Sequence, residues 1–470
     1  MLGYLRLFRL AGMHVAVVGG GIAGLSAALE ATRLGARVTV LESSSRVGGK
    51  VAVSEVGGLS VDEGADAMLT RVPDGLALAR DAGLEPELTA PAAGQAFVWS
   101  RGALRPLPTG TLLGLPTDLA ALAHSGLLSA RGLNRVPLDL LLPGTPTTDD
   151  ISVGDLVRRR FGREVVDRLV DPLLGGVYAG HADRLSLRAT LPQLVPHAAR
   201  HRSLLLAARA ARAATPPTDG PLFASLPGGL GRLPAAVAAA ASGADIRLGS
   251  TVRGLARTPT GWRLILGSAA APEQLQADAV VLAVPAAPAA RLLQHLVPAA
   301  AAELAGVDYA SVAIVTLVLD GGVGRASGSG YLIPAVEGRT TKAVTFSSRK
   351  WAHLAGPQSV VRASVGRHGE TADLQRPDTE LVEIVQQELA DNVGPLPRLM
   401  ASRVTRWGGG LPQYAVGHLD LVARLRSAVA QQDGLAVAGA AYDGVGVPAC
   451  ARSGREAART VLRQNERHER

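Results

Sequence analysis

The first clear pattern along the chain is an apolar run over residues 14–18 that ends in glycines. A segment of small residues that predicts a helix follows over 22–34, and a second apolar run covers 37–41. Gly35 separates the helix from the second run. The order of strand, glycine turn, helix and strand predicts a βαβ unit with parallel strands and a right-handed crossover.

Farther along, the pattern changes from helical to strand-like and back. Residues from about 100 to 220 are rich in Pro and Leu and contain helical patches, which predicts a mostly helical insertion. Clusters of Pro, Thr and Gly predict loops at 143–148 and 215–220. The clearest remaining elements are helices at 151–161 and 203–214, strands at 262–266, 279–284 and 311–319, a helix at 378–392 with Asp378 as its N-cap, a strand at 435–438 and a closing helix at 450–465.

The composition limits the core and the compartment. Of the 470 residues, 47% are hydrophobic but only 3% are aromatic, so small aliphatic side chains must fill most of the core. The length predicts two or three domains. The single cysteine, Cys450, excludes a disulfide within the chain and a cysteine-based zinc site, and it fits a reducing, cytoplasmic compartment; no metal is expected. Residues 1–12 are interpreted as an extension of no known role before a functional start at Met13.

The charge is basic but dispersed. The chain has 48 Lys and Arg against 40 Asp and Glu, a formal net charge of +8, without a long basic block. Dispersed charge and few aromatics argue against a nucleic-acid partner. A solvated surface explains the excess, and a field that attracts anionic small molecules is the alternative. No uninterrupted apolar run of about 18 residues predicts a transmembrane helix, whereas peripheral membrane contact stays open.

Residues 19–24, with the sequence GGGIAG, match the G-x-G-x-x-G pattern between a strand and a helix, which is the context that dinucleotide binding requires. Gly19 permits a tight turn, Gly21 permits close approach of a pyrophosphate, and Gly24 permits close packing of helix and strand. The start of the helix offers free N–H groups and a positive dipole end to phosphate. Glu42, at the end of the second strand, is placed to bind ribose hydroxyls.

Residues 42–50 read ESSSRVGGK, which resembles the E-x(n)-R-x-G-G-[KR] element of the FAD-dependent amine oxidase and protoporphyrinogen oxidase superfamily. Residues 62–66 continue the resemblance, and family members place this turn against the flavin and its ribityl chain. The closing segment 438–448 forms a second glycine-rich turn between a buried strand and a helix. Related flavoproteins often carry Gly-Asp at this strand end, whereas residues 439–440 here are Gly-Ala, so the usual contact must be replaced or lost. Asp443 comes too late in the turn to be taken as its replacement.

Several further blocks narrow the resemblance. They are DPLLGGVYAG at 171–180, LPGGL at 226–230, RW at 406–407, PQY at 412–414, GH at 417–418 and GVGVP at 444–448. Together they resemble the oxygen-dependent protoporphyrinogen/coproporphyrinogen oxidase family of haem biosynthesis, over nearly the whole chain from Met13. The spellings YAG at 178–180 and VGR at 365–367 favour the bacterial coproporphyrinogen III oxidase branch.

The resemblance implies an α/β fold with α+β insertions, as in amine-oxidase-like flavoproteins. It combines a Rossmann-type FAD-binding domain, a sheet-containing substrate domain and a mostly helical insertion. The FAD-binding domain is expected from residues 13–95, 223–290 and 403–470. Residues 96–222 are expected to form the helical insertion with part of the substrate domain, and residues 291–402 the substrate-binding domain.

The resemblance also implies FAD as cofactor and a six-electron oxidation of coproporphyrinogen III to coproporphyrin III. Hydride passes stepwise to flavin N5, and molecular oxygen reoxidises the flavin with release of hydrogen peroxide. The flavin carries this chemistry, so no certain catalytic side chain is assigned. The porphyrinogen and oxygen are the expected partners, with transient contact to a ferrochelatase.

The expected site combines cofactor contacts with cations for the substrate. Coproporphyrinogen carries four propionates, and arginine binds carboxylates in bidentate geometry. The substrate candidates are Arg71, Lys342, Arg362 and Arg367, each of which has a solvated surface residue as its alternative reading. The cofactor candidates are Gly19, Gly20, Gly21, Ile22, Ala23, Gly24, Leu25, Glu42, Ser43, Arg46, Gly49, Lys50, Gly64, Ala65, Asp66, Ala67, Val252, Trp407, Gly439, Val445, Gly446 and Val447. His181 and His418 are interpreted as structural or exposed residues and not as proton relays.

Other functions stay open at this point. A protoporphyrinogen IX oxidase acts on a substrate that differs only by vinyl in place of propionate groups. An amine oxidase should have an aromatic cage, which 3% aromatics makes hard to build. A carotenoid desaturase would favour an apolar surface that dips into a membrane. A non-catalytic flavin-binding accessory to haem insertion is the alternative from a different class.

Overall fold

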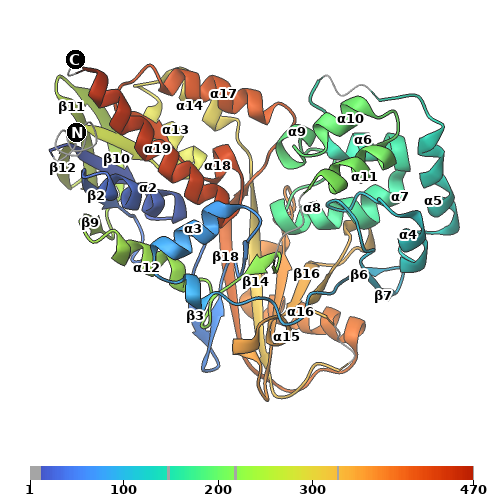
Figure 1. Ribbon diagram of the computed structural model, residues 1–470. Coiled ribbons are helices and arrows are strands. Elements are labelled where there is room, and N and C mark those ends of the chain that lie inside the picture. The colour runs from blue at the N-terminus through green and yellow to red at the C-terminus, as the bar shows by residue number, and fades with distance from the viewer. Residues whose placement is uncertain (1–11, 146–148, 216–219, 325–327, 469–470) are drawn as a thin grey trace.

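The structure, a computed structural model, describes residues 12–145, 149–215, 220–324 and 328–468. The loops expected at 143–148 and 215–220 lie partly, and the extension 1–12 almost wholly, outside the described residues. Figure 1 shows three lobes: a nucleotide-binding lobe at the left, a sheet lobe below the centre and a helical lobe at the right. Both ends of the described chain lie in the nucleotide-binding lobe (Figure 1).

The nucleotide-binding lobe contains a five-stranded parallel sheet with strand order β19-β13-β1-β2-β9. The sheet strands are β1 (His14–Val18), β2 (Arg37–Leu41), β9 (Ala244–Arg247), β13 (Ala279–Leu282) and β19 (Leu435–Val437). The rest of the lobe comprises α2 (Ile22–Arg33), β3 (Val53–Val56), β4 (Leu59–Asp62), β5 (Met68–Leu69), α3 (Pro73–Asp81), β8 (Phe223–Ala224), α12 (Arg232–Ala240), β10 (Val252–Thr258), β11 (Gly261–Ser268), β12 (Ala271–Ala277), α13 (Ala286–Leu293), α14 (Pro298–Ala305), α17 (His418–Val429), α18 (Ala440–Asp443) and α19 (Val447–His468).

Both faces of the parallel sheet are covered, as the continuous apolar runs predict. Val15 and Val17 of β1 lie in one cluster with the alanine faces of α2 and α19. Ala16 and Val18 point to the opposite side, into a cluster with β11, α13, α14 and α17. Small residues allow very close packing on the first face, since a Cβ on Gly454 of α19 would lie 2.0 Å from the backbone oxygen of Ala23.

The sheet lobe is a seven-stranded sheet with strand order β18-β14-β17-β16-β15-β6-β7. Its neighbours are antiparallel except for β15 and β6, which are parallel. A long helix, α16, packs on one face through Leu381, Val385 and Leu389. The elements are β6 (Ala96–Ser100), β7 (Ala103–Pro106), β14 (Tyr309–Leu319), β15 (Gly330–Leu332), β16 (Thr341–Phe346), α15 (Ser347–Lys350), β17 (Ser359–Val365), α16 (Asp378–Val393) and β18 (Leu399–Pro412).

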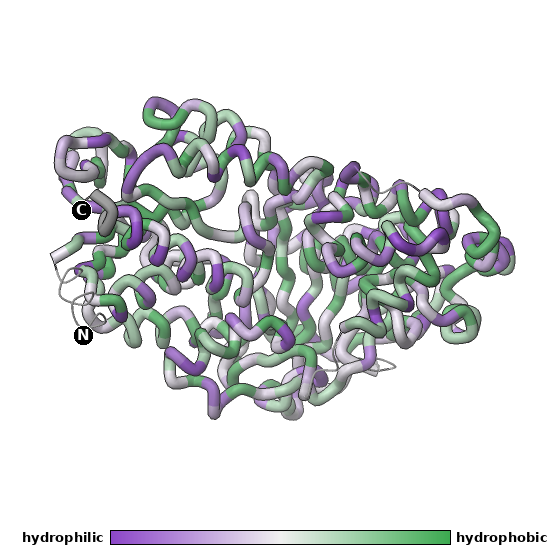
Figure 2. The backbone as a smooth tube through the Cα atoms, turned by 45° about the horizontal axis from the view of Figure 1, so that its top comes forward, coloured by the Kyte–Doolittle hydropathy of each residue, from purple (hydrophilic) through white to green (hydrophobic). Residues whose placement is uncertain are grey.

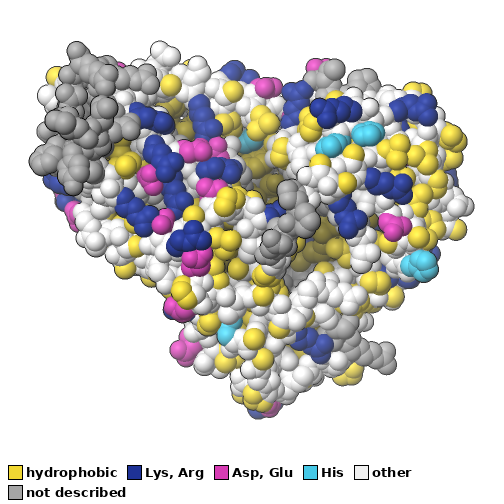
Figure 3. Space-filling model, in the orientation of Figure 1, with side chains coloured by type: hydrophobic (Ala, Val, Ile, Leu, Met, Phe, Trp, Pro, Cys, Tyr) yellow, Lys and Arg dark blue, Asp and Glu magenta, His cyan; other side chains and the backbone are white. Residues whose placement is uncertain are grey.

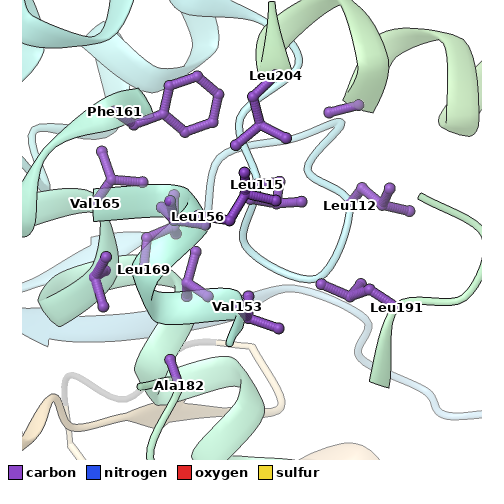
Figure 4. Packing of buried hydrophobic residues seen from close by; sticks show 14 of the residues in the cluster. Leu112, Leu115, Val153, Leu156, Phe161, Val165, Leu169, Ala182, Leu191 and Leu204 are labelled. Carbon is purple, nitrogen blue, oxygen red and sulfur yellow. The ribbon is translucent and has the colours of Figure 1, made fainter. Parts of the chain in front are cut away.

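The helical lobe has its own apolar core, in which Phe161, Leu169 and Leu204 come from different helices (Figure 4). Figure 2 shows apolar and polar positions alternating along the helices of this lobe, with the largely apolar strands of the sheet lobe beside them. The helices are α4 (Leu119–Ser125), α5 (Ala130–Arg135), α6 (Val153–Phe161), α7 (Arg163–Val165), α8 (Asp171–Tyr178), α9 (Leu187–Thr190), α10 (Val195–Arg200) and α11 (Leu204–Ala214).

Three details differ from the sequence expectations. Asp378 is wrong as the N-cap of α16, because Pro377 takes that position and the Asp378 carboxylate accepts from Arg406 instead. Strand β18 belongs to the seven-stranded sheet and so crosses the boundary expected at residue 403. The closing helix begins at Val447, three residues before the expected start.

Candidate cofactor and substrate site

The glycine turn after β1 is fixed by steric contacts that exclude any side chain. Gly19 has φ +107°, and a Cβ on it would lie 2.5 Å from the backbone oxygen of Ala283. A Cβ on Gly24 would lie 1.8 Å from the backbone oxygen of Gly19. These two glycines therefore bring β1, β13 and the start of α2 into direct backbone contact, as the motif requires.

Gly21 is different, because a Cβ on it would meet no described atom within 4 Å. It is the N-cap of α2, and no side chain caps the helix start or places an acidic residue in its first turn. The N–H groups of Ile22, Ala23 and Gly24 therefore have no acceptor within the helix, and they lie at its start with the positive end of the helix dipole. Leu25 already donates its N–H to Gly21 O within the helix, and its side chain is buried.

The loop 46–50 lies against this turn. Gly48 N donates to Gly20 O at 2.8 Å, and a Cβ on Gly49 would lie 3.5 Å from Gly21 Cα. Arg46 is exposed and donates to the carbonyl oxygens of Val47 and Gly49, so it shapes the loop. These contacts explain why residues 48 and 49 are glycines, since the loop 46–50 approaches the glycine turn after β1 at backbone distance.

Lys50 supplies a cation beside the turn. Burial lowers the pKa of its ammonium group, and its Nζ lies 5.8 Å from the centre of the Tyr309 ring. In the part of the chain that the structure describes, this ammonium has no hydrogen-bonded or ion-paired carboxylate. A half-buried cation without an acidic partner fits an anionic group of a bound molecule.

Glu42 is held at the carboxyl end of β2 by backbone donors. Gly20 N donates to Oε2 at 2.7 Å, and Ser44 N donates to Oε1 at 2.8 Å. The exposed Ser43 adds a long contact to Oε1. Ser250 N also donates to the backbone oxygen of Glu42, which places the segment leading to Val252 beside it. Oε2, with a single donor, keeps a lone pair for a further donor such as a ribose hydroxyl.

We expect Glu42→Gln to weaken FAD binding about tenfold, because one oxygen that accepts from a backbone N–H becomes an NH₂ group that cannot accept. Titration of FAD-free protein with FAD, followed by flavin fluorescence, measures the dissociation constant. The exposed Glu55→Gln is the matched control and should bind like the wild type. An unchanged dissociation constant in the Glu42 variant would contradict the ribose assignment.

The turn 62–67 meets the same region from the other side. A Cβ on Gly64 would lie 2.0 Å from Lys50 O, so the turn crosses the glycine loop at backbone contact. Trp407 of β18 donates from Nε1 to Glu63 O at 2.9 Å, and Arg362 of β17 donates to Gly64 O at 2.6 Å. The sheet lobe thus holds this turn, with Ala65 exposed and Ala67 half-buried beside it.

Asp66 anchors the turn through its side chain. Its carboxylate accepts from Lys350 Nζ at 2.8 Å and from Trp351 Nε1 at 3.2 Å, and lies 3.5 Å from Arg362 Nη1. Burial alone would raise the pKa of this carboxyl, but the two cations lower it to about 2. Lys350 and Trp351 were not predicted from the sequence, where a Lys-Trp pair after a strand carries no signal of its own.

The closing turn is held by a chain of hydrogen bonds. Gly439 has φ +129°, and its N–H donates to Ser453 Oγ at 3.0 Å. Ser453 in turn donates to Asp443, which also accepts from Arg426. Asp443 therefore fixes the Gly439 amide indirectly, and it does not stand where related flavoproteins carry their Asp. Val447 is buried at the start of α19 against α2, whereas Val445 is half-buried and Gly446 is exposed.

The four substrate candidates do not form one cluster. Lys342 and Arg367 are both buried and close enough to influence each other, with Glu370 as the neighbouring acid. Arg362 is buried elsewhere, where Gly64 O and Asp66 already engage it. Arg71 is exposed in the turn between β5 and α3.

The arrangement fits FAD. Open space at Gly21, an uncapped helix start, the unpaired Lys50 and the Glu42 carboxylate offer what a dinucleotide needs for pyrophosphate and ribose. The contacts of individual residues with the cofactor remain predictions.

Among the described residues, no helix is long and apolar enough to span a membrane.

Comparison with known proteins places this fold among flavoproteins. Proteins named coproporphyrinogen III oxidase from Bacillus subtilis and Mycobacterium tuberculosis H37Rv are 34% and 36% identical, over 96% and 95% of this chain and 98% and 96% of their own. Human protoporphyrinogen oxidase is 31% identical over 96% of this chain and 98% of its own. The crystal structure of a candidate protoporphyrinogen oxidase from Exiguobacterium sp. 255-15 has a TM-score of 0.86 at 33% identity, covering 96% of this chain and 99% of the other.

A putrescine oxidase variant, 17% identical with a TM-score of 0.72 and covering 96% of this chain and 99% of its own, shares the fold. These likenesses confirm the expected amine-oxidase-like flavoprotein fold. The family described as flavin containing amine oxidoreductase matches residues 22–462, nearly the whole chain. It implies FAD as the cofactor and an FAD-dependent oxidoreductase as the activity. The chain therefore belongs to the flavin-containing amine oxidoreductase family.

Proposed function

We propose that this protein oxidises coproporphyrinogen III to coproporphyrin III with FAD and molecular oxygen, releasing hydrogen peroxide, in haem biosynthesis. The observation that carries the proposal is the near full-length match to bacterial proteins named coproporphyrinogen III oxidase at 34–36% identity. The open space at Gly21 in the glycine turn after β1 also supports the proposal, since the reaction needs a bound flavin.

The chain's own residues would hold FAD in defined parts. The start of α2 and Lys50 would bind the pyrophosphate, and Glu42 the ribose. The turn 62–67 and Trp407 would lie at the flavin end, braced by Arg362 and Lys350. When bound, FAD supplies the acceptance of two electrons in each of three oxidations and their transfer to oxygen.

Lys342, Arg367 and Arg71 are proposed to receive the substrate propionates. Lys342 is almost fully buried, and in the described chain its ammonium has no hydrogen-bonded carboxylate. Arg367 donates to Ile333 O and lies 3.4 Å from Glu370, which is half exposed. This buried pair of cations has a single, half-exposed carboxylate beside it, and an incoming propionate would supply a second one. Arg71, exposed in the turn between β5 and α3, would meet a propionate at the surface.

Lys342 gives the reaction a pH dependence. Burial, with a smaller contribution from Arg367, lowers the pKa of its ammonium from 10.5 to about 7, while Glu370 acts in the opposite sense. The group is charged below this pH and neutral above it, so kcat/KM for coproporphyrinogen should fall by about threefold to tenfold between pH 6.5 and 8.5. Initial rates of porphyrin fluorescence, corrected for autoxidation, measure the profile.

Lys342→Met should have the low kcat/KM at all these pH values, while Arg263→Met, which removes an exposed cation on β11, should keep the wild-type profile. A profile in the Lys342 variant that still falls above pH 7 would remove this lysine from the substrate site.

The activity itself is tested by supplying FAD-loaded protein with coproporphyrinogen III and, separately, protoporphyrinogen IX in air. We expect faster porphyrin formation from coproporphyrinogen III, with one hydrogen peroxide released for each pair of electrons. No rate above autoxidation with either substrate would refute the proposed function. Faster turnover of protoporphyrinogen would assign the protein to the activity that its human relative is named for.

The surroundings of the reaction follow from its chemistry. The porphyrin product needs a metal inserted, so transient contact with a ferrochelatase is proposed as the next step. A cytoplasmic location is proposed from the single cysteine, Cys450, which is half-buried and unpaired.

A further inference from the structure

The two buried cations Lys342 and Arg367 stand at the end of the seven-stranded sheet that also carries Trp407. Val365, at the end of β17, and Trp407 of β18 pair with neighbouring residues of β14, which lies between them. Strands lie about 4.8 Å apart, so the end of β17 is about 10 Å from Trp407 across the sheet. Arg367 follows Val365 by two residues, and Lys342 follows Thr341, which pairs with Val365 from the other side. Both cations therefore lie beside the tryptophan that is predicted to contact the flavin.

The helical lobe meets the sheet lobe at this same end of the sheet. Ala179, directly after α8, packs in the apolar cluster that includes Trp407. In the turn 366–370 after β17, His368 N donates to Ala179 O at 2.7 Å, and His181 Nε2 lies 3.2 Å from His368 O. Figure 3 shows the surface hollowed along parts of the boundary of the helical lobe. The turn 366–370 therefore joins the two lobes next to the cations.

Glu370, at the end of this turn, brings a carboxylate to the two cations. Its Oε2 lies 3.4 Å from Arg367 Nη1, and its Oε1 lies 3.8 Å from His181 Nε2. Both separations exceed the about 2.7–2.9 Å of a good hydrogen bond between charged groups, and the side chain is 51% exposed. Burial lowers the pKa of Lys342 most and Arg367 adds to this, whereas Glu370 opposes both. The carboxylate thus acts on all three basic groups and is held firmly by none of them.

A second acid near Arg367 is held more firmly. Asp171, at the start of α8, is half-buried, and its carboxylate accepts from Ala182 N at 2.7 Å. In the described chain, no backbone N–H donates to the Glu370 carboxylate. Glu370 can therefore turn away at little cost, whereas Asp171 would leave a backbone donor without its acceptor.

We propose that the Glu370 carboxylate stands in for a substrate propionate in the free protein and is exchanged for it when the substrate binds. The propionate then neutralises Arg367 and Lys342, and Glu370 turns toward His181 and the solvent. The inference rests on the proposed function, which gives these two cations to the propionates.

The exchange makes Glu370 a specificity-determining residue. An uncharged ring substituent at this position leaves Glu370 beside Arg367 and Lys342, so the buried cations stay neutralised. Without Glu370, a bound molecule would have to supply the carboxylate itself, because buried charges without a partner are costly. Glu370 therefore lets the site tolerate a substituent other than propionate, and its removal should sharpen the preference for carboxylates.

The test measures binding of coproporphyrin III to the full-length, FAD-loaded protein at pH 6.0 by porphyrin fluorescence. This oxidised tetracarboxylate binds without any turnover. Glu370→Gln, which keeps the shape of a half-exposed side chain, should bind it about threefold to tenfold more tightly, because a competing carboxylate is gone. Coproporphyrin III tetramethyl ester, which has the same ring but no charge, should gain nothing. Glu383→Gln, the same change at an exposed position of α16, is the matched control and should bind both compounds like the wild type.

Lys342→Met separates exchange at this site from a general change in charge. In the Lys342→Met protein, Glu370→Gln should improve binding of coproporphyrin III by less than about twofold, because one of the cations for which the two carboxylates compete is missing. The four proteins form a double-mutant cycle, and a role of Glu370 in folding alone would not produce this coupling.

Unchanged or weaker binding of coproporphyrin III by Glu370→Gln, beside a wild type that binds it saturably, would overturn the exchange and leave the proposed oxidation standing. The exchange is also overturned by an equal gain with and without Lys342, or by an equal gain in Glu383→Gln. The expected pattern of binding in a protein that does not oxidise coproporphyrinogen III would support the exchange and refute the oxidation. A wild type that does not bind coproporphyrin III would overturn both.

Discussion

Gly21→Val should abolish FAD binding while the protein still folds. Gly21 has φ −73° and ψ −179°, an extended conformation that valine adopts without strain, and its Cβ position is empty. The valine side chain would therefore leave the protein undisturbed and occupy the space that the pyrophosphate needs. We expect the dissociation constant for FAD to rise at least roughly 100-fold, about 2.7 kcal/mol. Equilibrium titration of the FAD-free protein measures it.

Two other glycines separate loss of cofactor from loss of fold. Gly356→Val adds a side chain at an equally open, exposed position in the sheet lobe and should bind FAD normally. Gly24→Val would force a Cβ to within 1.8 Å of Gly19 O and should destabilise the protein itself. A Gly21→Val protein that purifies with a full complement of FAD would show that the pyrophosphate does not pass this glycine.

Asp66→Asn should destabilise the protein by about 2 to 3 kcal/mol, because it leaves Lys350 and Arg362 buried together without their carboxylate. The value lies below the roughly 3 to 5 kcal/mol typical of a fully buried pair, since the Asp66 and Lys350 side chains are 20% and 18% exposed. Urea unfolding of the FAD-free protein measures the loss. The double variant Asp66→Asn, Lys350→Met removes one of the stranded cations and should recover part of it.

The same network predicts an acid transition. The pKa of Asp66 is about 2 in the folded chain against an ordinary value of 3.8, so its stabilisation is complete above pH 3.8 and is lost as the pH falls toward 2. The unfolding free energies of the wild type and Asp66→Asn should therefore converge at low pH. A constant difference between the two proteins down to pH 2 would show that the ion pairs do not carry the effect.

The local elements of the fold could be predicted because their signals lie within a few residues. Strand β1 and helix α2 begin where the apolar run and the glycines placed them. Asp378 was wrong as the N-cap because its carboxylate accepts a hydrogen bond from Arg406 of β18 instead. The local sequence around Asp378 does not show that Arg406 lies beside it. Strands β6 and β7 pair with each other as a hairpin around residues 101 and 102. The pairing of β6 with β15, more than 200 residues later, leaves no local pattern in the sequence.

The residues of the candidate site also divide into those that a local sequence pattern predicts and those that only the fold brings together. The glycine turn and Glu42 are a local motif, so their positions followed from spacing alone. Lys350 and Trp351 reach Asp66 across a separation of 284 and 285 residues and could not be found without the fold. Arg362 was chosen as a substrate cation, but its guanidinium braces Gly64 and Asp66, which is a contact between lobes that its sequence neighbours do not indicate.

The order of strands in the parallel sheet has a consequence for synthesis on the ribosome. Strand β1 emerges first but lies in the middle of the sheet, beside β13, and the edge strand β19 with helix α19 comes from the end of the chain. Until α19 emerges, the alanine face of α2 lacks its packing against α19 and the closing turn does not exist. The nascent chain therefore keeps this apolar surface exposed until α19 has emerged, and chaperones have a long interval in which to act.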